Sequence, residues 1–194
     1  AKACIVGQDG ILSTPAASHL IRMHNADGGL ILSASHNPGG PDADFGLKYN
    51  GPNGGPASEE VTDTIYKHTM TLDFYKIATC EDVELDKIGE QSTEGMKVKI
   101  VDSVSDYADL MQKIVDFDKI RTLFSGGFRM CFDAMHAVTG PYAHTILEDM
   151  LGAPKGTVIN GIPSEDFGKG HPDPNPIWAK QLMDIMHSTN APDF

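Results

Sequence analysis

The chain has 194 residues, of which 40% are hydrophobic and 22% charged, and its formal net charge is −12. This composition is typical of a globular protein with one large domain or two small ones. Nucleic-acid phosphates require a basic surface, so the acidic charge argues against a nucleic-acid partner. No apolar run is long enough to span a bilayer, no signal-peptide pattern is visible, and the three scattered cysteines predict neither a disulfide framework nor structural zinc.

The first residues alternate between strand and helix patterns. The apolar run at 3–6 predicts a short buried strand. Ser13 or Thr14 then caps a helix that has Pro15 at its first position, where a missing N–H is harmless. Residues 30–32 predict a second buried strand. The chain then enters a long segment, 33–56, which is rich in Gly, Pro, Asn and Asp and therefore predicts a loop at the end of a strand.

Three further patterns complete this region. Ser58 and the two glutamates after it predict a helix, because acidic side chains stabilise a helix N-terminus. Residues 71–95 show no clean period and predict turns and short strands, whereas residues 97–100 alternate like a half-buried strand. We expect these elements to form a first domain over residues 1–102.

The second half repeats the pattern, and we expect a second domain over residues 103–194. Ser103 and Asp106 resemble a capping box that opens an amphipathic helix. Strands are predicted at 128–132 and 157–159, and helices are predicted to start at Pro141 and at Asn175. The alternation of strands and helices implies an α/β fold, with layered α/β/α domains and mixed sheets.

Ser35 is the candidate catalytic residue of the 33–56 loop. A serine hydroxyl becomes an effective nucleophile only when it is positioned or activated. Ser35 follows a buried strand, which is where open α/β sheets bind their ligands. Pro38 and the two glycines after it allow a tight turn whose N–H groups can hold phosphate oxygens, and His36 and Asn37 add polar groups. On these residues alone, an ordinary polar turn is the simpler interpretation.

Other polar residues have both a functional and a structural interpretation. Lys48 lies in a predicted hairpin arm, which we expect to bring it back toward Ser35. Asp133 and His136 follow a strand and suggest an acid–base pair, although hydrogen bonds at a domain interface are the favoured interpretation. The segment from His171 to Asn175 suggests a metal or proton-transfer site, but a rigid loop with Asn175 as a helix cap is favoured.

The run SASHNPGGPDADFGLKYNGPNGGP at 33–56 strongly resembles the active-site segment of the α-D-phosphohexomutases, and most closely their phosphoglucomutase and parafusin branch. Four more stretches resemble that branch in the same order: VGQDGILSTPA at 6–16, KIVDSVSDYADLM at 99–111, CFDAMHAVTGPY at 131–142 and EDFGKGHPDPNP at 165–176. The resemblance therefore covers essentially the whole chain.

The resemblance implies a role for each candidate residue. Ser35 matches the serine that carries a phosphate, which passes to glucose 1-phosphate or glucose 6-phosphate and makes glucose 1,6-bisphosphate. That intermediate reorients and returns its other phosphate to Ser35. His36 matches a histidine beside the phosphate, and Lys48 matches a lysine that serves proton transfer or charge stabilisation. Asn37 is expected to hold the loop or to contact the phosphate.

The resemblance also implies Mg²⁺, bound in this family by three aspartates of a DGDGD-type loop and by an oxygen of the serine or its phosphate. No DGDGD occurs in the sequence, so Ser35 is the only metal ligand assigned here. We therefore expect an incomplete fold: most of domain 1 and the opening part of domain 2, ending before the metal loop and inactive by itself.

We expect the full-length protein to be a cytoplasmic, monomeric phosphoglucomutase that acts on small-molecule sugar phosphates. Two alternatives remain at this point. One is a non-enzymatic phosphoprotein of the same family that binds partners. The other is a mutase for another hexose phosphate, because the loop that discriminates between sugars is absent from the chain.

Overall fold

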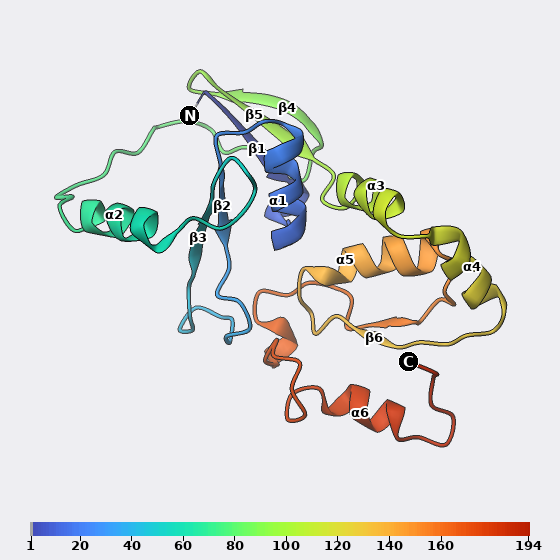
Figure 1. Ribbon diagram of the computed structural model, residues 1–194. Helices are drawn as coiled ribbons and strands as arrows, with labels where there is room; N and C mark the ends of the chain where they lie inside the picture. The colour runs from blue at the N-terminus through green and yellow to red at the C-terminus, as the bar shows by residue number, and fades with distance from the viewer. Residues whose placement is uncertain (1) are drawn as a thin grey trace. The chain divides into compact units, whose positions relative to one another are not determined.

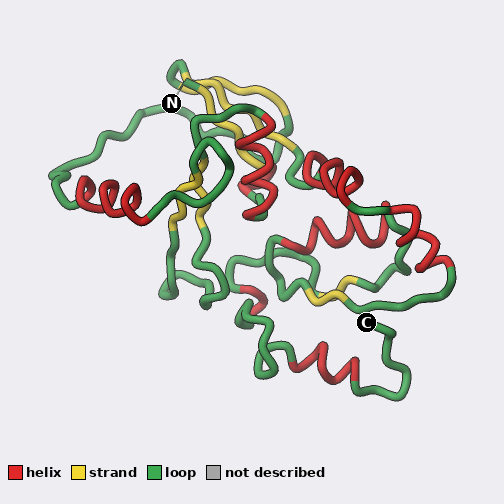
Figure 2. The backbone as a smooth tube through the Cα atoms, viewed as in Figure 1, coloured by secondary structure: helices red, strands yellow, loops and turns green. Residues whose placement is uncertain are grey.

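The computed structural model describes residues 2–194 (Figure 1). Its strands are β1 (Ala3–Gly7), β2 (Gly29–Leu32), β3 (Leu47–Asn50), β4 (Gly89–Thr93), β5 (Met96–Val101), β6 (Phe132–Asp133) and β7 (Val158–Ile159). Its α-helices are α1 (Thr14–Met23), α2 (Glu59–Thr69), α3 (Ser105–Ile114), α4 (Phe117–Ser125), α5 (Thr139–Ala143) and α6 (Lys180–Met186). A π-helical segment, His144–Met150, continues α5, and short 3₁₀ turns lie at Gln8–Gly10 and Phe167–Lys169. Loops of varied length join these elements (Figure 2).

The chain forms two compact units. The first comprises the residues up to Ile31 together with Lys48–Asp106. The second comprises Leu32–Leu47 together with Tyr107–Phe194. The loop that carries Ser35 therefore groups with the second unit. The strand before it, β2, begins in the first unit, and the strand after it, β3, ends in the first unit. The sequence-based division after residue 102 remains a prediction.

The first unit is built on a three-stranded sheet with the order β1-β5-β4, in which β5 is the middle strand (Figure 1). β1 runs parallel to β5, with Ala3 opposite Lys97, whereas β4 is antiparallel to β5. The expected mixed sheet is thus confirmed. Ile100 of β5 is fully buried, because a central strand is covered by its neighbours.

Helix α1 forms as the sequence predicts. The Ser13 hydroxyl accepts a hydrogen bond from the Ala16 N–H at 3.3 Å, and Pro15 lies in the first turn. Ala16, Leu20 and Ile21 form its buried face. Gly29 of β2 lies so close to Ile21 that an added Cβ would approach the Ile21 Cδ1 to 2.8 Å, so the helix packs directly on the start of β2.

The capping box predicted at Ser103 is wrong. The side chain of Asp102 accepts hydrogen bonds from the N–H groups of Val104 and Ser105, at 3.0 and 2.6 Å. The Ser103 hydroxyl instead donates to the Gln8 carbonyl, at 3.3 Å. Asp102 follows β5 directly, so its carboxylate reaches the first free amides of α3 before Ser103 can, and α3 begins at Ser105.

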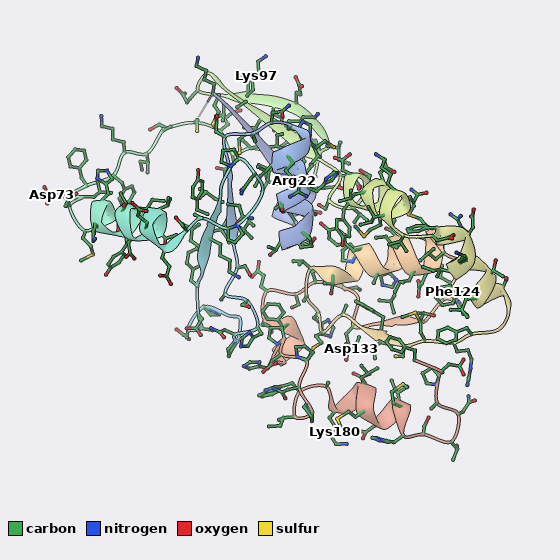
Figure 3. The ribbon with its side chains drawn as sticks, viewed as in Figure 1. Arg22, Asp73, Lys97, Phe124, Asp133 and Lys180 are labelled. Atoms are coloured by element: carbon green, nitrogen blue, oxygen red, sulfur yellow. The ribbon has the colours of Figure 1, made fainter. Side chains whose placement is uncertain are left out.

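The core of the second unit differs from the expected pattern in one helix. Asp116 accepts a hydrogen bond from the Lys119 N–H at 3.1 Å and starts α4, which the sequence analysis did not predict. Phe117 and Phe124 of α4 pack with Leu151 and Ala153 in a buried cluster, and Phe124 is labelled in Figure 3. A turn at Asp116 thus gives the chain two shorter helices, each with one apolar face toward the core.

Two predicted elements are shorter than expected. The strand predicted at 128–132 is limited to β6, because only Phe132 and Asp133 pair with β7. The helix predicted from Asn175 begins at Lys180, because the residues that follow Asn175 form a capped turn first.

Glu148 is a buried carboxylate in the π-helical segment, and its side chain is 2% exposed. It accepts hydrogen bonds from the N–H groups of Gly156 and Val158, at 3.0 and 3.2 Å, and His144 Nδ1 lies 3.0 Å away. Burial alone raises the pKa of Glu148, but the hydrogen bonds from His144, Val158 and Gly156 outweigh it and lower the pKa below the ordinary value of 4.5. Glu148 therefore connects the π-helical segment to the start of β7 by hydrogen bonds.

We predict that Glu148→Gln lowers the free energy of unfolding by about 1–3 kcal/mol, because buried amides lose a charged acceptor. Since the folded pKa is depressed, the contribution of Glu148 is present above pH 4.5 and is lost as the pH falls below it. Urea unfolding between pH 7 and pH 3 measures both effects. Asp149→Asn, on the exposed neighbour, serves as the control. Equal pH slopes for the unmodified protein and Glu148→Gln would contradict this account.

Candidate active site

The Ser35 loop joins β2 to β3 and is closed at its base by backbone contacts. The Ser33 N–H donates to the Gly46 carbonyl at 2.9 Å. A Cβ on Gly46 would collide with the carbonyl oxygen of Ser33, which is backbone and cannot move aside. Residue 46 must therefore be glycine for the loop to close in this way.

Ser35 has a left-handed backbone, with φ of 63°. This conformation is uncommon for a residue with a side chain and costs about 1–2 kcal/mol relative to the right-handed one. Two local hydrogen bonds hold it: the Ser35 N–H donates to the Ser33 hydroxyl at 3.1 Å, and the Asn37 N–H donates to the Ala34 carbonyl at 3.2 Å. A strained serine in a tight turn is common at functional sites.

The Ser35 side chain is exposed, as is His36, whereas Asn37 is half-buried. The Ser35 hydroxyl lies 3.4 Å from His36 Nδ1, which is long for a hydrogen bond between these groups. The contact brings the two expected side chains together but does not make His36 a closely bonded base. An exposed hydroxyl beside an imidazole is accessible to a phosphorylated ligand.

Lys48 is exposed on β3 and belongs to the first unit, whereas Ser35 belongs to the second. The expected approach of Lys48 to Ser35 therefore stays a prediction. Asp42 and its neighbours form a turn, in which the Ala43 N–H donates to the Gly40 carbonyl at 3.1 Å.

Asp133 and His136 hold loops in place at the carboxyl end of β6, where Figure 3 labels Asp133. The Asp133 carboxylate accepts hydrogen bonds from the Met135 N–H and from the Asn160 side-chain amide, both at 2.9 Å. His136 Nδ1 lies 3.1 Å from the Ile162 carbonyl. Each residue is thus hydrogen-bonded to a separate structural partner within the second unit. The expected place of these two residues at a domain interface stays a prediction.

The segment from His171 to Asn175 is a rigid, capped loop. The Asn175 side-chain oxygen accepts hydrogen bonds from the N–H groups of Ile177 and Trp178, at 2.9 and 3.3 Å. The His171 ring stacks on Trp178 with 4.7 Å between centroids. Asn175 is therefore a cap, as favoured from the sequence.

No group of three or more His, Cys, Asp or Glu residues that could hold a metal ion occurs within residues 2–194. Magnesium prefers a nearly complete octahedron of oxygen ligands. Ser35 offers one such oxygen, so the residues described here do not fit a complete magnesium site by themselves. None of the helices in the same part of the chain is long and apolar enough to cross a membrane.

The contact between the Ser35 loop and the 3₁₀ turn Phe167–Lys169 of the second unit was not predicted from the sequence. The backbone of Gly39 lies directly against the ring of Phe167. The two residues are far apart in the sequence, and no local pattern links them. The nearest signal is the glycine itself, which is the residue that allows a close approach.

A strained serine turn in an α/β protein fits the phosphohexomutase class that the sequence resembles. Family models for the phosphoglucomutase/phosphomannomutase α/β/α domain I and domain II match residues 1–76 and 105–194. The chain therefore belongs to the phosphoglucomutase/phosphomannomutase family. The resemblance and the α/β fold class expected from the sequence are both confirmed.

Individual relatives agree with this assignment. A phosphoglucomutase of Rhizobium radiobacter is 56% identical over 98% of this chain, and a chloroplastic phosphoglucomutase of Arabidopsis thaliana is 51% identical over the same share. A crystal structure of parafusin, an exocytosis-sensitive phosphoprotein and phosphoglucomutase from Paramecium, is 44% identical, with a TM-score of 0.92 over 100% of this chain and 38% of its own. The chain spans about a third of its curated relatives, covering 35% and 31% of the two enzymes.

We predict that Ser33→Ala weakens the turn at Ser35, because it removes the hydroxyl that accepts from the Ser35 N–H. A net hydrogen-bond contribution of about 0.5–1.5 kcal/mol corresponds to exchange of the Ser35 amide that is roughly 2- to 10-fold faster. Amide hydrogen exchange measured by NMR tests this. Ser33→Thr keeps the hydroxyl and is expected to exchange at the original rate. Equal exchange in the Ala and Thr variants would refute the role of Ser33.

Proposed function

We propose that the whole protein is a phosphoglucomutase, an enzyme that interconverts glucose 1-phosphate and glucose 6-phosphate. The observation that carries this proposal is the exposed Ser35–His36 pair in a strained turn, in a chain about half identical to proteins named phosphoglucomutase. Phosphoryl transfer depends mainly on positioning and charge neutralisation, and a rigid turn with polar neighbours supplies the first of these.

In the proposed reaction, phosphorylated Ser35 gives its phosphoryl group to a free hydroxyl of the sugar phosphate. The bond between the Ser35 oxygen and phosphorus breaks as a new bond from the sugar oxygen to phosphorus forms, and the proton of the sugar hydroxyl passes to the Ser35 oxygen, which becomes a free hydroxyl. The product is glucose 1,6-bisphosphate. After this intermediate turns round, its other phosphate returns to Ser35 by the same step in reverse, and the product sugar oxygen regains a proton.

The neighbours of Ser35 have proposed roles in this transfer. His36 is close enough to the Ser35 hydroxyl to stabilise charge on the phosphate or to orient the sugar hydroxyl. Lys48 contributes general acid–base catalysis or stabilises the charge of the transferring group. Asn37, half-buried and bonded through its backbone to Ala34, holds the loop or contacts the phosphate.

We propose Mg²⁺ as the cofactor, with an oxygen of Ser35 or its phosphate as the one ligand from this chain. A divalent cation bound there would neutralise phosphate charge. The remaining ligands are proposed to come from outside these 194 residues, and glucose 1,6-bisphosphate is the proposed activator.

A second candidate function is that of a phosphoprotein that binds partners. It is favoured by the likeness to parafusin, which is an exocytosis-sensitive phosphoprotein. A mutase for another hexose phosphate is the third, because the family model covers phosphomannomutases as well. Comparing turnover of glucose 1-phosphate with that of mannose 1-phosphate separates the two catalytic candidates, and no turnover of either favours the phosphoprotein.

The remaining parts of the proposal concern organisation and location. We propose a division into domains after residue 102, a monomeric whole protein, sugar phosphates as its partners without nucleic acid, and a cytoplasmic location. The relative from Arabidopsis thaliana is named as a chloroplastic enzyme, so cell fractionation is the decisive test of location.

We predict that Ser35→Ala lowers the turnover of the whole protein at least about a thousandfold, since loss of a covalent nucleophile removes the main route of reaction. The assay follows glucose 6-phosphate formed from glucose 1-phosphate with Mg²⁺ and a trace of glucose 1,6-bisphosphate. Ser188→Ala, which removes an exposed hydroxyl elsewhere, is the control. Normal turnover by Ser35→Ala would refute the assignment of Ser35.

We also predict that the 194-residue chain, assayed alone, is at least about a thousandfold less active than the whole protein, because catalysis depends on groups held together in one geometry. The same assay at equal molar concentration measures this. Substantial turnover by the isolated chain would show that Ser35 and its neighbours are sufficient.

A further inference from the structure

Gly39 lies four residues beyond Ser35 and makes the closest contact between the Ser35 loop and the rest of the second unit. A Cβ added to Gly39 would collide with the ring of Phe167 and would lie 2.7 Å from the Glu165 carbonyl oxygen. The loop backbone therefore rests against one aromatic ring and one peptide carbonyl. Only glycine allows this approach, because any side chain would have to displace both the Phe167 ring and the backbone carbonyl of Glu165.

Phe167 is itself held in an unusual conformation. Its φ is 51°, and the next two residues, Gly168 and Lys169, both have φ of 62°. Left-handed backbone at two residues with side chains costs about 1–2 kcal/mol each, so the surrounding contacts must maintain it. The turn therefore points the Phe167 ring in one fixed direction.

Asp166 is the residue that maintains this turn. Its carboxylate accepts hydrogen bonds from the Ser164 hydroxyl and the Gly168 N–H, at 2.6 and 3.0 Å. The Ser164 bond is the largest of the interactions that hold the pKa of Asp166 below its ordinary value, so the acceptor stays ionised near neutral pH. The Phe167 N–H also donates to the Ser164 carbonyl at 3.0 Å.

This turn is also connected by hydrogen bonds to the sheet of the second unit. The Ser164 N–H donates to the His136 carbonyl at 2.9 Å, and the His136 N–H donates to the Asn160 carbonyl at the same distance. His136 and Asn160 follow β6 and β7 at their carboxyl ends. A continuous set of hydrogen bonds thus connects the β6–β7 sheet to the turn that carries the Phe167 ring.

We propose that Phe167 is a positioning residue for phosphoryl transfer: its ring, fixed to the β6–β7 sheet, supports Gly39 and thereby fixes the orientation of the Ser35 turn. This inference rests on the proposed function of Ser35. Phe167 acts through the loop backbone and touches no reacting atom.

A support of this kind affects catalysis more than binding. In phosphoryl transfer the attacking and leaving oxygens must be roughly in line, and a displacement of about 1 Å can cost about a hundredfold in rate. The Ser35 loop has its base at Ser33 and Gly46, so Gly39 is supported far from that closure. Loss of the ring would leave the middle of the loop free to tilt.

The test compares three substitutions in the whole protein with the unmodified enzyme. Phe167→Ala removes the ring, Gly39→Ala pushes the loop away from it, and Phe167→Tyr keeps it. We expect kcat for glucose 1-phosphate to fall at least about tenfold in the first two, with KM changed less than about threefold, and to stay within about twofold for Phe167→Tyr. Phe74→Ala, which removes an exposed ring from the first unit, is the matched control.

A second measurement follows the loop itself. Hydrogen exchange of the Ser35 and Asn37 amides is expected to accelerate in Phe167→Ala and to remain unchanged in Phe167→Tyr and Phe74→Ala. The proposal is overturned if kcat and exchange in Phe167→Ala match those of Phe74→Ala. The proposal is also overturned if kcat falls in Phe167→Ala and falls by the same factor in Phe167→Tyr.

Failure of the proposed function has a different signature. If the unmodified whole protein does not interconvert the glucose phosphates, the phosphoglucomutase assignment fails. The exchange measurement alone then decides whether Phe167 supports the Ser35 loop. Faster exchange at Ser35 and Asn37 in Phe167→Ala would retain Phe167 as the support of the loop, and unchanged exchange would reject it.

Discussion

The backbone of Ser35 is left-handed, and the geometry of the candidate active site depends on how that conformation is maintained. The Ser33 hydroxyl holds the Ser35 N–H from within the loop, and the Gly46 carbonyl closes the loop at its base. The Phe167 ring meets the loop from outside, at Gly39. A serine that transfers phosphate must present its oxygen in one direction, so a strained turn with support on both sides suits that task.

The second unit is organised around polar side chains that form hydrogen bonds with loop backbone at the ends of short strands. Asp133 bonds to Met135 and Asn160, and Glu148 bonds to the amides that lead into β7. Strands of two residues supply few ladder hydrogen bonds, so side-chain acceptors take over part of their role. A side-chain acceptor of the same kind, the Asp166 carboxylate, stabilises the turn that carries Phe167.

Local signals predicted much of this fold. The cap at Ser13, the strand at 97–100 and the loop after residue 32 were all readable, because each depends on residues close together in the sequence. The errors at Ser103 and at the second-unit helices arose where neighbouring residues compete for one role. Asp102 took the capping position, and Asp116 began helix α4, for which the sequence had predicted no element.

The sequence by itself determined the family, the identity of Ser35 as the candidate nucleophile and the glycines that its loop requires, because these follow from local residue chemistry and from a specific motif. The tertiary structure alone decided that this loop groups with the second unit and that Phe167 supports it at Gly39. Such a contact joins residues far apart in the chain, and it depends on how the β6–β7 loops are fastened, which no local pattern records.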